Sequence, residues 1–100
     1  MASVEIYTTP TCPYCHAAKQ LLASKGIDYF EEDVSVSAER RTEMTRRAGG
    51  RDTVPQIFVG GHHVGGFDDL HMLDEIGRLD ALVRDAREPA TAGAMRPAGA

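Results

Sequence analysis

The chain is poor in cysteine, in aromatic residues and in long apolar runs. Its 100 residues include two cysteines, three tyrosines, three phenylalanines and no tryptophan. Two cysteines are too few for the disulfide framework that staples small secreted domains. No apolar run approaches the roughly 20 residues of a membrane-spanning helix, and the first residues show no signal-peptide pattern. We therefore expect a cytoplasmic protein without a membrane partner.

An excess of positive charge is also missing. The 11 Lys and Arg residues face 15 Asp and Glu residues, which leaves a net charge of -4. No basic cluster is longer than the pairs Arg40-Arg41 and Arg46-Arg47, so we expect no nucleic-acid partner. An apolar content of 42% over this length is ordinary for one globular domain.

Apolar periodicity and Gly and Pro positions divide the chain into short elements. We expect strands over 4–8, 27–34, 56–59 and 62–64, helices over 13–25, 38–48 and 68–76 (capped by Asp68 or Asp69), and a short final turn or helix over 79–83. A strand-helix-strand unit implies parallel pairing, and the Gly60-Gly61 turn adds an antiparallel hairpin. The order βαβαββα predicts an α/β fold: a four-stranded mixed sheet with helices on both faces.

The last residues differ in composition from the rest. From about Arg87 the chain is rich in Ala, Gly and Pro and has no apolar period. Such a segment buries too little apolar surface to fold. We predict one domain over 1–86 and a disordered tail over 87–100.

The two cysteines form one motif, Cys12-Pro13-Tyr14-Cys15, between a predicted strand and a predicted helix. A C-x-x-C in this position is typical of a thioredoxin-like redox site, because a helix N-terminus favours the attacking thiolate. Zinc binding is a weaker alternative, since a structural zinc site needs four ligands and no second Cys pair exists. A structural disulfide is also weak, because so short a loop restricts the unfolded chain little. We predict redox chemistry and no metal.

Three segments together resemble the dithiol glutaredoxins of bacterial type. They are Cys12-Pro13-Tyr14-Cys15, Thr53-Val54-Pro55-Gln56-Ile57-Phe58-Val59 and Gly65-Gly66-Phe67-Asp68-Asp69-Leu70. The resemblance covers about residues 3 to 84 and implies a thioredoxin-like fold. It also implies a monomeric oxidoreductase with glutathione as co-substrate and no permanently bound cofactor. Its substrates would be disulfide-containing or glutathionylated proteins, with ribonucleotide reductase as one candidate.

The resemblance also implies where glutathione binds. The implied binding residues are Tyr14, Thr53, Val54, Pro55, Gly66, Phe67 and Asp68. A cis Pro55 would face the cysteines, and the backbone of Val54 would pair with the ligand as an added strand does. The amides that open the third helix suit a carboxylate, and Asp68 would meet the ligand's amino group.

One position departs from the family pattern. Many dithiol glutaredoxins carry Lys where this chain has Thr9, and that lysine would pair with the glycine carboxylate of glutathione. Arg46, Arg47 and Arg51 are the candidate replacements.

In the predicted mechanism Cys12 is the nucleophile and Cys15, more buried and with a higher pKa, is the resolving thiol. Tyr14 covers the rim of the site. The histidines, His16, His62, His63 and His71, are interpreted as surface residues.

Two other functions remain open. A redoxin of the same fold could take electrons from thioredoxin reductase and donate them to ribonucleotide reductase. A dimer could instead hold a [2Fe–2S] cluster through Cys12 and glutathione, although Pro13 tightens the helix start and disfavours this.

Overall fold

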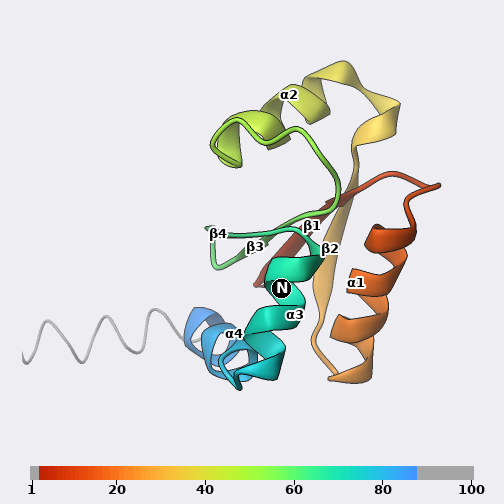
Figure 1. Cartoon of the computed structure of the whole chain (residues 1–100). Coiled ribbons are helices and arrows are strands. Elements are labelled where there is room, and N and C mark those ends of the chain that lie inside the picture. Colours follow the sequence, from red (N-terminus) through yellow and green to blue (C-terminus); the bar gives the residue numbers. More distant parts are fainter. Residues whose placement is uncertain (1–2, 88–100) are drawn as a thin grey trace, which may run out of the picture.

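The computed structural model describes residues 3–87 and shows the predicted mixed sheet with helices on both faces (Figure 1). The elements are β1 (Val4–Thr8), α1 (Pro13–Ser24), β2 (Tyr29–Asp33), the 3-10 turn η1 (Val34–Val36), α2 (Ala38–Arg47), β3 (Gln56–Val59), β4 (His62–Gly65), α3 (Phe67–Glu75) and α4 (Leu79–Arg87). The predicted tail lies outside the described residues except for Arg87, which ends α4. Within the described part of the chain, no helix has the length and apolar character needed to cross a membrane.

The four strands lie in the order β2-β1-β3-β4. β1 pairs in parallel with β2 and antiparallel with β3, and β3 pairs antiparallel with β4. The Gly60-Gly61 turn joins β3 to β4, and both glycines have positive φ, which glycine adopts without steric cost. The predicted crossover and hairpin are therefore confirmed.

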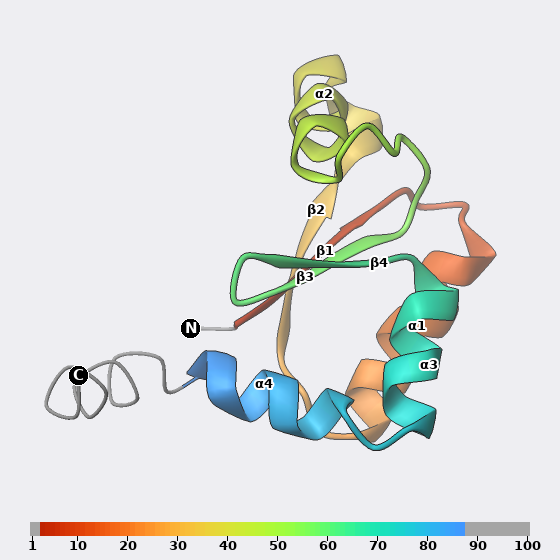
Figure 2. The ribbon, with the colours of Figure 1, turned by 60° about the vertical axis from the view of Figure 1, so that its left-hand side comes forward.

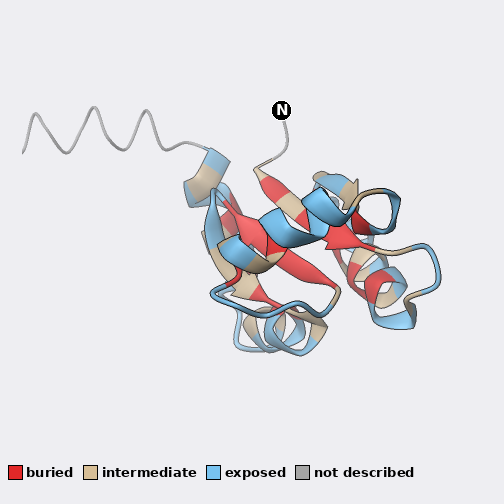
Figure 3. Cartoon of the chain, turned by 90° about the horizontal axis from the view of Figure 1, so that it is seen from above, coloured by how far each residue is buried: buried red, intermediate tan, exposed pale blue. Residues whose placement is uncertain are grey.

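Each face of the sheet has its own apolar core, because alternate strand residues point to opposite faces. Ile6 of β1 and Ile57 of β3 face α1, α3 and α4, where they meet Leu22 and Leu70. The opposite face packs under α2 through a smaller cluster that includes Tyr7, Val34, Met44, Ala48 and Phe58. Figure 2 shows α2 on one side of the sheet and α1, α3 and α4 on the other. Figure 3 shows the buried residues concentrated along the central strands.

Local chemistry explains where the helices begin and end. Pro13 opens α1 at a position that needs no N–H. Gly26, with φ of 70°, ends it, and the amide of Ile27 donates back to the carbonyl of Leu22. Ser37 caps α2 by accepting from the amides of Glu39 and Arg40, as predicted.

Two boundaries differ from the prediction. The second strand spans Tyr29–Asp33 rather than 27–34, because Val34 already belongs to η1. The third helix begins at Phe67 with Gly66 as its N-cap, so neither Asp68 nor Asp69 occupies the cap position. Asp69 acts from inside the first turn instead: its Oδ2 accepts from the Gly66 amide at 2.9 Å.

Candidate active site

Cys12 lies at the N-cap of α1, where the first turn leaves backbone amides unpaired. Its sulfur accepts from the amide of Cys15 at 3.0 Å, so the thiol itself caps the helix. The same sulfur donates toward the carbonyl oxygen of Val54 at 3.7 Å. Cys12 is partly exposed and is a free thiol. An amide aimed at a sulfur stabilises negative charge there, which is what an attacking thiolate needs.

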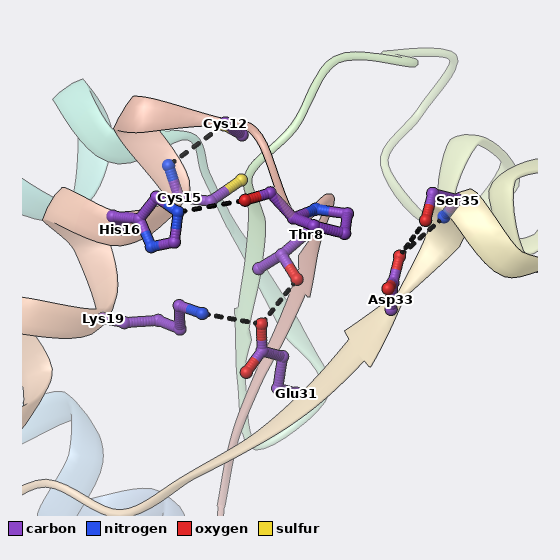
Figure 4. A network of polar contacts seen from close by, with 9 residues as sticks. Thr8, Cys12, Cys15, His16, Lys19, Glu31, Asp33 and Ser35 are labelled. Atoms are coloured by element: carbon purple, nitrogen blue, oxygen red, sulfur yellow. Dashed lines mark hydrogen bonds and ion pairs between the residues drawn. The ribbon is translucent and has the colours of Figure 1, made fainter.

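Cys15 lies one turn further along α1 and is fully buried. Burial, together with a hydrogen bond to Cys12, raises the pKa of the Cys15 thiol to about 12. The predicted greater burial of the second cysteine is confirmed. The two thiols of the motif therefore differ in environment: Cys12 is partly exposed and Cys15 is buried. Figure 4 shows both residues at the start of α1.

The loop before β3 forms the opposite side of the site. The Val54–Pro55 peptide bond is cis, as the resemblance implied. Gln56 holds the loop from below, since its side-chain amide donates to the carbonyl and the hydroxyl of Thr53. The Val54 carbonyl thereby reaches the Cys12 sulfur across 42 residues of sequence.

A groove of about 450 Å³ runs beside this loop. It is lined by Tyr14, Arg51, Thr53, Val54, Pro55, Gly66, Phe67, Asp68 and Asp69. All seven predicted glutathione-binding residues are thus brought together, from three separate segments of the chain. Arg51 and Asp69 line the groove as well, although the predicted binding set did not include them.

The start of α3 closes one end of the groove. Gly65 has φ of 122°, and a Cβ there would collide with the Asp69 carboxylate. The chain therefore turns tightly into Phe67, whose ring lies 6.3 Å from that of Tyr14 and stacks on His71 at 5.6 Å. Tyr14 is 63% exposed, so this aromatic row forms a rim beside the nucleophile.

Of the three candidate arginines, one lies in the groove. Arg51 lines it, with Nη1 at 3.4 Å from Oδ2 of Asp69. Arg47 packs over the Phe58 ring on the α2 face and bonds Glu5 and Tyr7. Arg46 pairs with Glu43 on the exposed side of α2. The arginine near the groove is therefore Arg51.

The histidines are arranged mostly as interpreted. His16, His62 and His71 are exposed, and a ring nitrogen of His16 lies 3.1 Å from the carbonyl oxygen of Pro10. His63 is different, because it is partly buried, its ring lies 4.9 Å from that of Phe58, and it bonds Gln56 at 2.7 Å. Burial lowers the pKa of His63. Among residues 3–87, no group of three or more His, Cys, Asp or Glu side chains is arranged to hold a metal ion.

Comparison with known proteins agrees with this geometry. The family model described as Glutaredoxin matches residues 4–64. The chain is 55% identical to Glutaredoxin 3 of Escherichia coli K12 over 84 residues, which are 84% of this chain and 100% of that relative. It is 54% identical to a glutaredoxin of Pseudomonas aeruginosa, over 83% of this chain and 98% of that one. The solution structure of glutaredoxin from Brucella melitensis matches with a TM-score of 0.73 and 54% identity, covering 83% of this chain and 89% of that one.

The sheet, its covering helices and the Cys12-Cys15 pair define a thiol-disulfide oxidoreductase of thioredoxin-like fold. Within that class, the chain belongs to the glutaredoxin family.

Proposed function

We propose that the chain is a glutathione-dependent oxidoreductase that reduces glutathione mixed disulfides and protein disulfides through Cys12 and Cys15. The observation that carries the proposal is the position of the Cys12 thiol. It contacts the Val54 carbonyl at the edge of a groove that is also lined by the first turn of α3. A volume of about 450 Å³ lies within the usual range for small-ligand pockets, about 300–1,000 Å³. Membership of the glutaredoxin family supports glutathione as the co-substrate.

The groove offers matching partners for each part of glutathione. The cysteinyl part would pair with the Val54 backbone, next to the cis Pro55. The γ-glutamyl carboxylate would accept from the amides at Phe67 and Asp68, where the helix dipole favours negative charge. The ligand's amino group would meet the Asp68 carboxylate, and the glycine carboxylate would meet Arg51.

With a glutathionylated substrate, one cysteine suffices. The Cys12 thiolate attacks the glutathione sulfur, the substrate leaves as a thiolate, and Cys12 carries the glutathione as a mixed disulfide. A second glutathione thiolate then attacks that sulfur, which releases oxidised glutathione and restores Cys12. Overall the substrate disulfide gains two electrons, one free glutathione is consumed, and the oxidised glutathione that leaves contains the glutathione that the substrate carried.

With a protein disulfide, both cysteines act. Cys12 attacks and forms a mixed disulfide with the substrate, and Cys15 then attacks the Cys12 sulfur and releases the reduced substrate. Two glutathiones reduce the resulting Cys12–Cys15 disulfide. Ribonucleotide reductase is a candidate substrate, and we place the monomeric protein in the cytoplasm.

The electron donor is tested by reducing a glutathione mixed disulfide in two parallel coupled assays. One contains glutathione and glutathione reductase, and the other contains thioredoxin reductase. We expect turnover in the assay with glutathione and glutathione reductase, and no turnover in the assay with thioredoxin reductase. Turnover only with thioredoxin reductase would contradict the proposal and favour the redoxin alternative, to which Thr9 in place of a lysine points. A brown dimeric protein on purification would instead favour the [2Fe–2S] alternative.

A further inference from the structure

The resolving thiol faces a chemical difficulty. Cys15 is fully buried, and burial raises the pKa of its thiol to about 12. Only the thiolate attacks a disulfide, so very little of Cys15 is reactive near neutral pH. The surroundings of Cys15 must supply whatever stabilises its negative charge.

One cation lies one helical turn from this thiol and is held in place by an ion pair. Lys19 follows Cys15 by one helical turn, so the two side chains share a face of α1. Its Nζ donates to Oε2 of Glu31 at 2.9 Å, and the hydroxyl of the buried Thr8 donates to the same oxygen at 2.7 Å. Figure 4 shows Lys19 below Cys15, reaching toward Thr8 and Glu31 on the neighbouring strands.

The other charged groups near Lys19 and Cys15 have hydrogen-bond partners of their own. Burial opposes ionisation of Glu31, but hydrogen bonds from Thr8 and Lys19 lower its pKa, so it stays anionic and anchors the lysine. Asp33 on the same strand bonds Ser35, and His16 bonds Pro10 on the exposed side of α1. The remaining titratable groups facing the pair are Cys12 on α1 and Tyr29 on β2.

The state of Cys12 changes during the reaction. In the free protein Cys12 disfavours the Cys15 thiolate through its hydrogen bond and its charge, whereas a hydrogen bond from the Thr9 backbone and, more weakly, the charge of Lys19 favour it. Once Cys12 is part of a mixed disulfide, it carries no charge. The ammonium of Lys19, which lies on α1 with Cys15, is then the charge on that helix that acts on Cys15.

We propose that Lys19, fixed by Glu31 and Thr8, is a positioning residue for the resolving step, in which its ammonium stabilises the Cys15 thiolate as that thiolate attacks the Cys12 mixed disulfide. This inference rests on the proposed roles of Cys12 and Cys15. In the step, the Cys15 thiolate forms the Cys12–Cys15 disulfide, the substrate sulfur leaves as a thiolate, and the Cys15 proton passes to solvent.

The test follows the two sulfurs separately with dithiobis(nitrobenzoate) in a stopped-flow instrument. Attack by Cys12 releases one thionitrobenzoate anion, and attack by Cys15 on the resulting mixed disulfide releases the second. In Lys19→Gln we expect the second release to slow about three- to tenfold near neutral pH, since a nearby cation is lost. The first release should change less than about twofold. The pH dependence of the second release should move to higher pH.

Three variants make the result decisive. Lys19→Arg keeps the charge and should restore the second release. Lys25→Gln is the matched control, because Lys25 lies past the end of α1 and pairs with Asp74 and Asp80. An unchanged second release in Lys19→Gln, or an equal slowing of both releases, would overturn the proposal. A second release in Cys15→Ser would instead overturn the role of Cys15 itself, and so the proposed function.

Discussion

Replacing Arg51 by Gln should weaken glutathione binding without changing the chemistry at sulfur. Arg51 lines the groove, yet the structure brings it to no contact with either cysteine. Its ion pair with Asp69 holds a cation beside the groove, whereas Thr9 carries no charge. We therefore expect KM for glutathione to rise and kcat to stay within about twofold at saturating glutathione.

The size of the effect follows from the exposure of Arg51. Its side chain is 50% exposed, so solvent screens its charge and an exposed charged contact contributes on the order of 1 kcal/mol. That corresponds to about a fivefold rise in KM. In the variant Asp69 would lose its ion-pair partner and would repel the ligand's carboxylate, which increases the expected rise in KM. Added salt should shrink the difference between variant and wild type.

The assay is steady-state reduction of a glutathione mixed disulfide at varied glutathione, coupled to glutathione reductase. Arg46→Gln is the matched control, because Arg46 is also an exposed arginine with an acidic partner but lies outside the groove. An unchanged KM in Arg51→Gln, or the same rise in both variants, would refute the assignment of Arg51 to the ligand carboxylate.

Two further predictions concern stability. Gly65→Ala should lower the midpoint of urea unfolding more than Gly77→Ala does. Both glycines have positive φ, but only at Gly65 does the new Cβ collide with Asp69. Similar losses in the two variants would contradict this prediction and show that the Asp69 side chain moves aside. In the folded protein the Cys15 thiol has a pKa of about 12, whereas an ordinary thiol has a pKa of 9.0. Because the folded state holds this proton more tightly than the unfolded state, the protonated thiol stabilises the folded protein. This stabilisation is complete below about pH 9 and is lost as the pH rises toward 12. The free energy of unfolding should therefore fall more steeply over that interval in wild type than in Cys15→Ala, and parallel curves would contradict the burial of the thiol.

Much of the fold was predictable because its signals are local. Gly26 and Ser37 mark helix ends by their own backbone or side-chain chemistry, and Gly60-Gly61 marks a hairpin. The start of α3 was harder. Two adjacent aspartates suggest caps, but the cap position falls at Gly66, whose amide donates to the Asp69 carboxylate inside the first turn.

The parts of the site that sequence reasoning left open or missed depend on contacts between distant segments. Arg51 was one of three plausible arginines, and only the folded chain separates it from Arg47, which is engaged by Tyr7 40 residues away. The pairing of Lys19 with Glu31 likewise joins α1 to β2, and no motif marks it. In contrast, the groove residues of the three recognisable segments were predictable, since each segment carries its own pattern.

The central claim is that Cys12 alone reduces glutathione mixed disulfides, whereas protein disulfides need Cys15 as well. The most direct measurement compares Cys12→Ser and Cys15→Ser with wild type on both substrate classes, with glutathione and glutathione reductase. We predict that Cys12→Ser loses both activities, while Cys15→Ser loses protein disulfide reduction and keeps reduction of the glutathione mixed disulfide. Equal loss of both activities in the two variants would contradict the account.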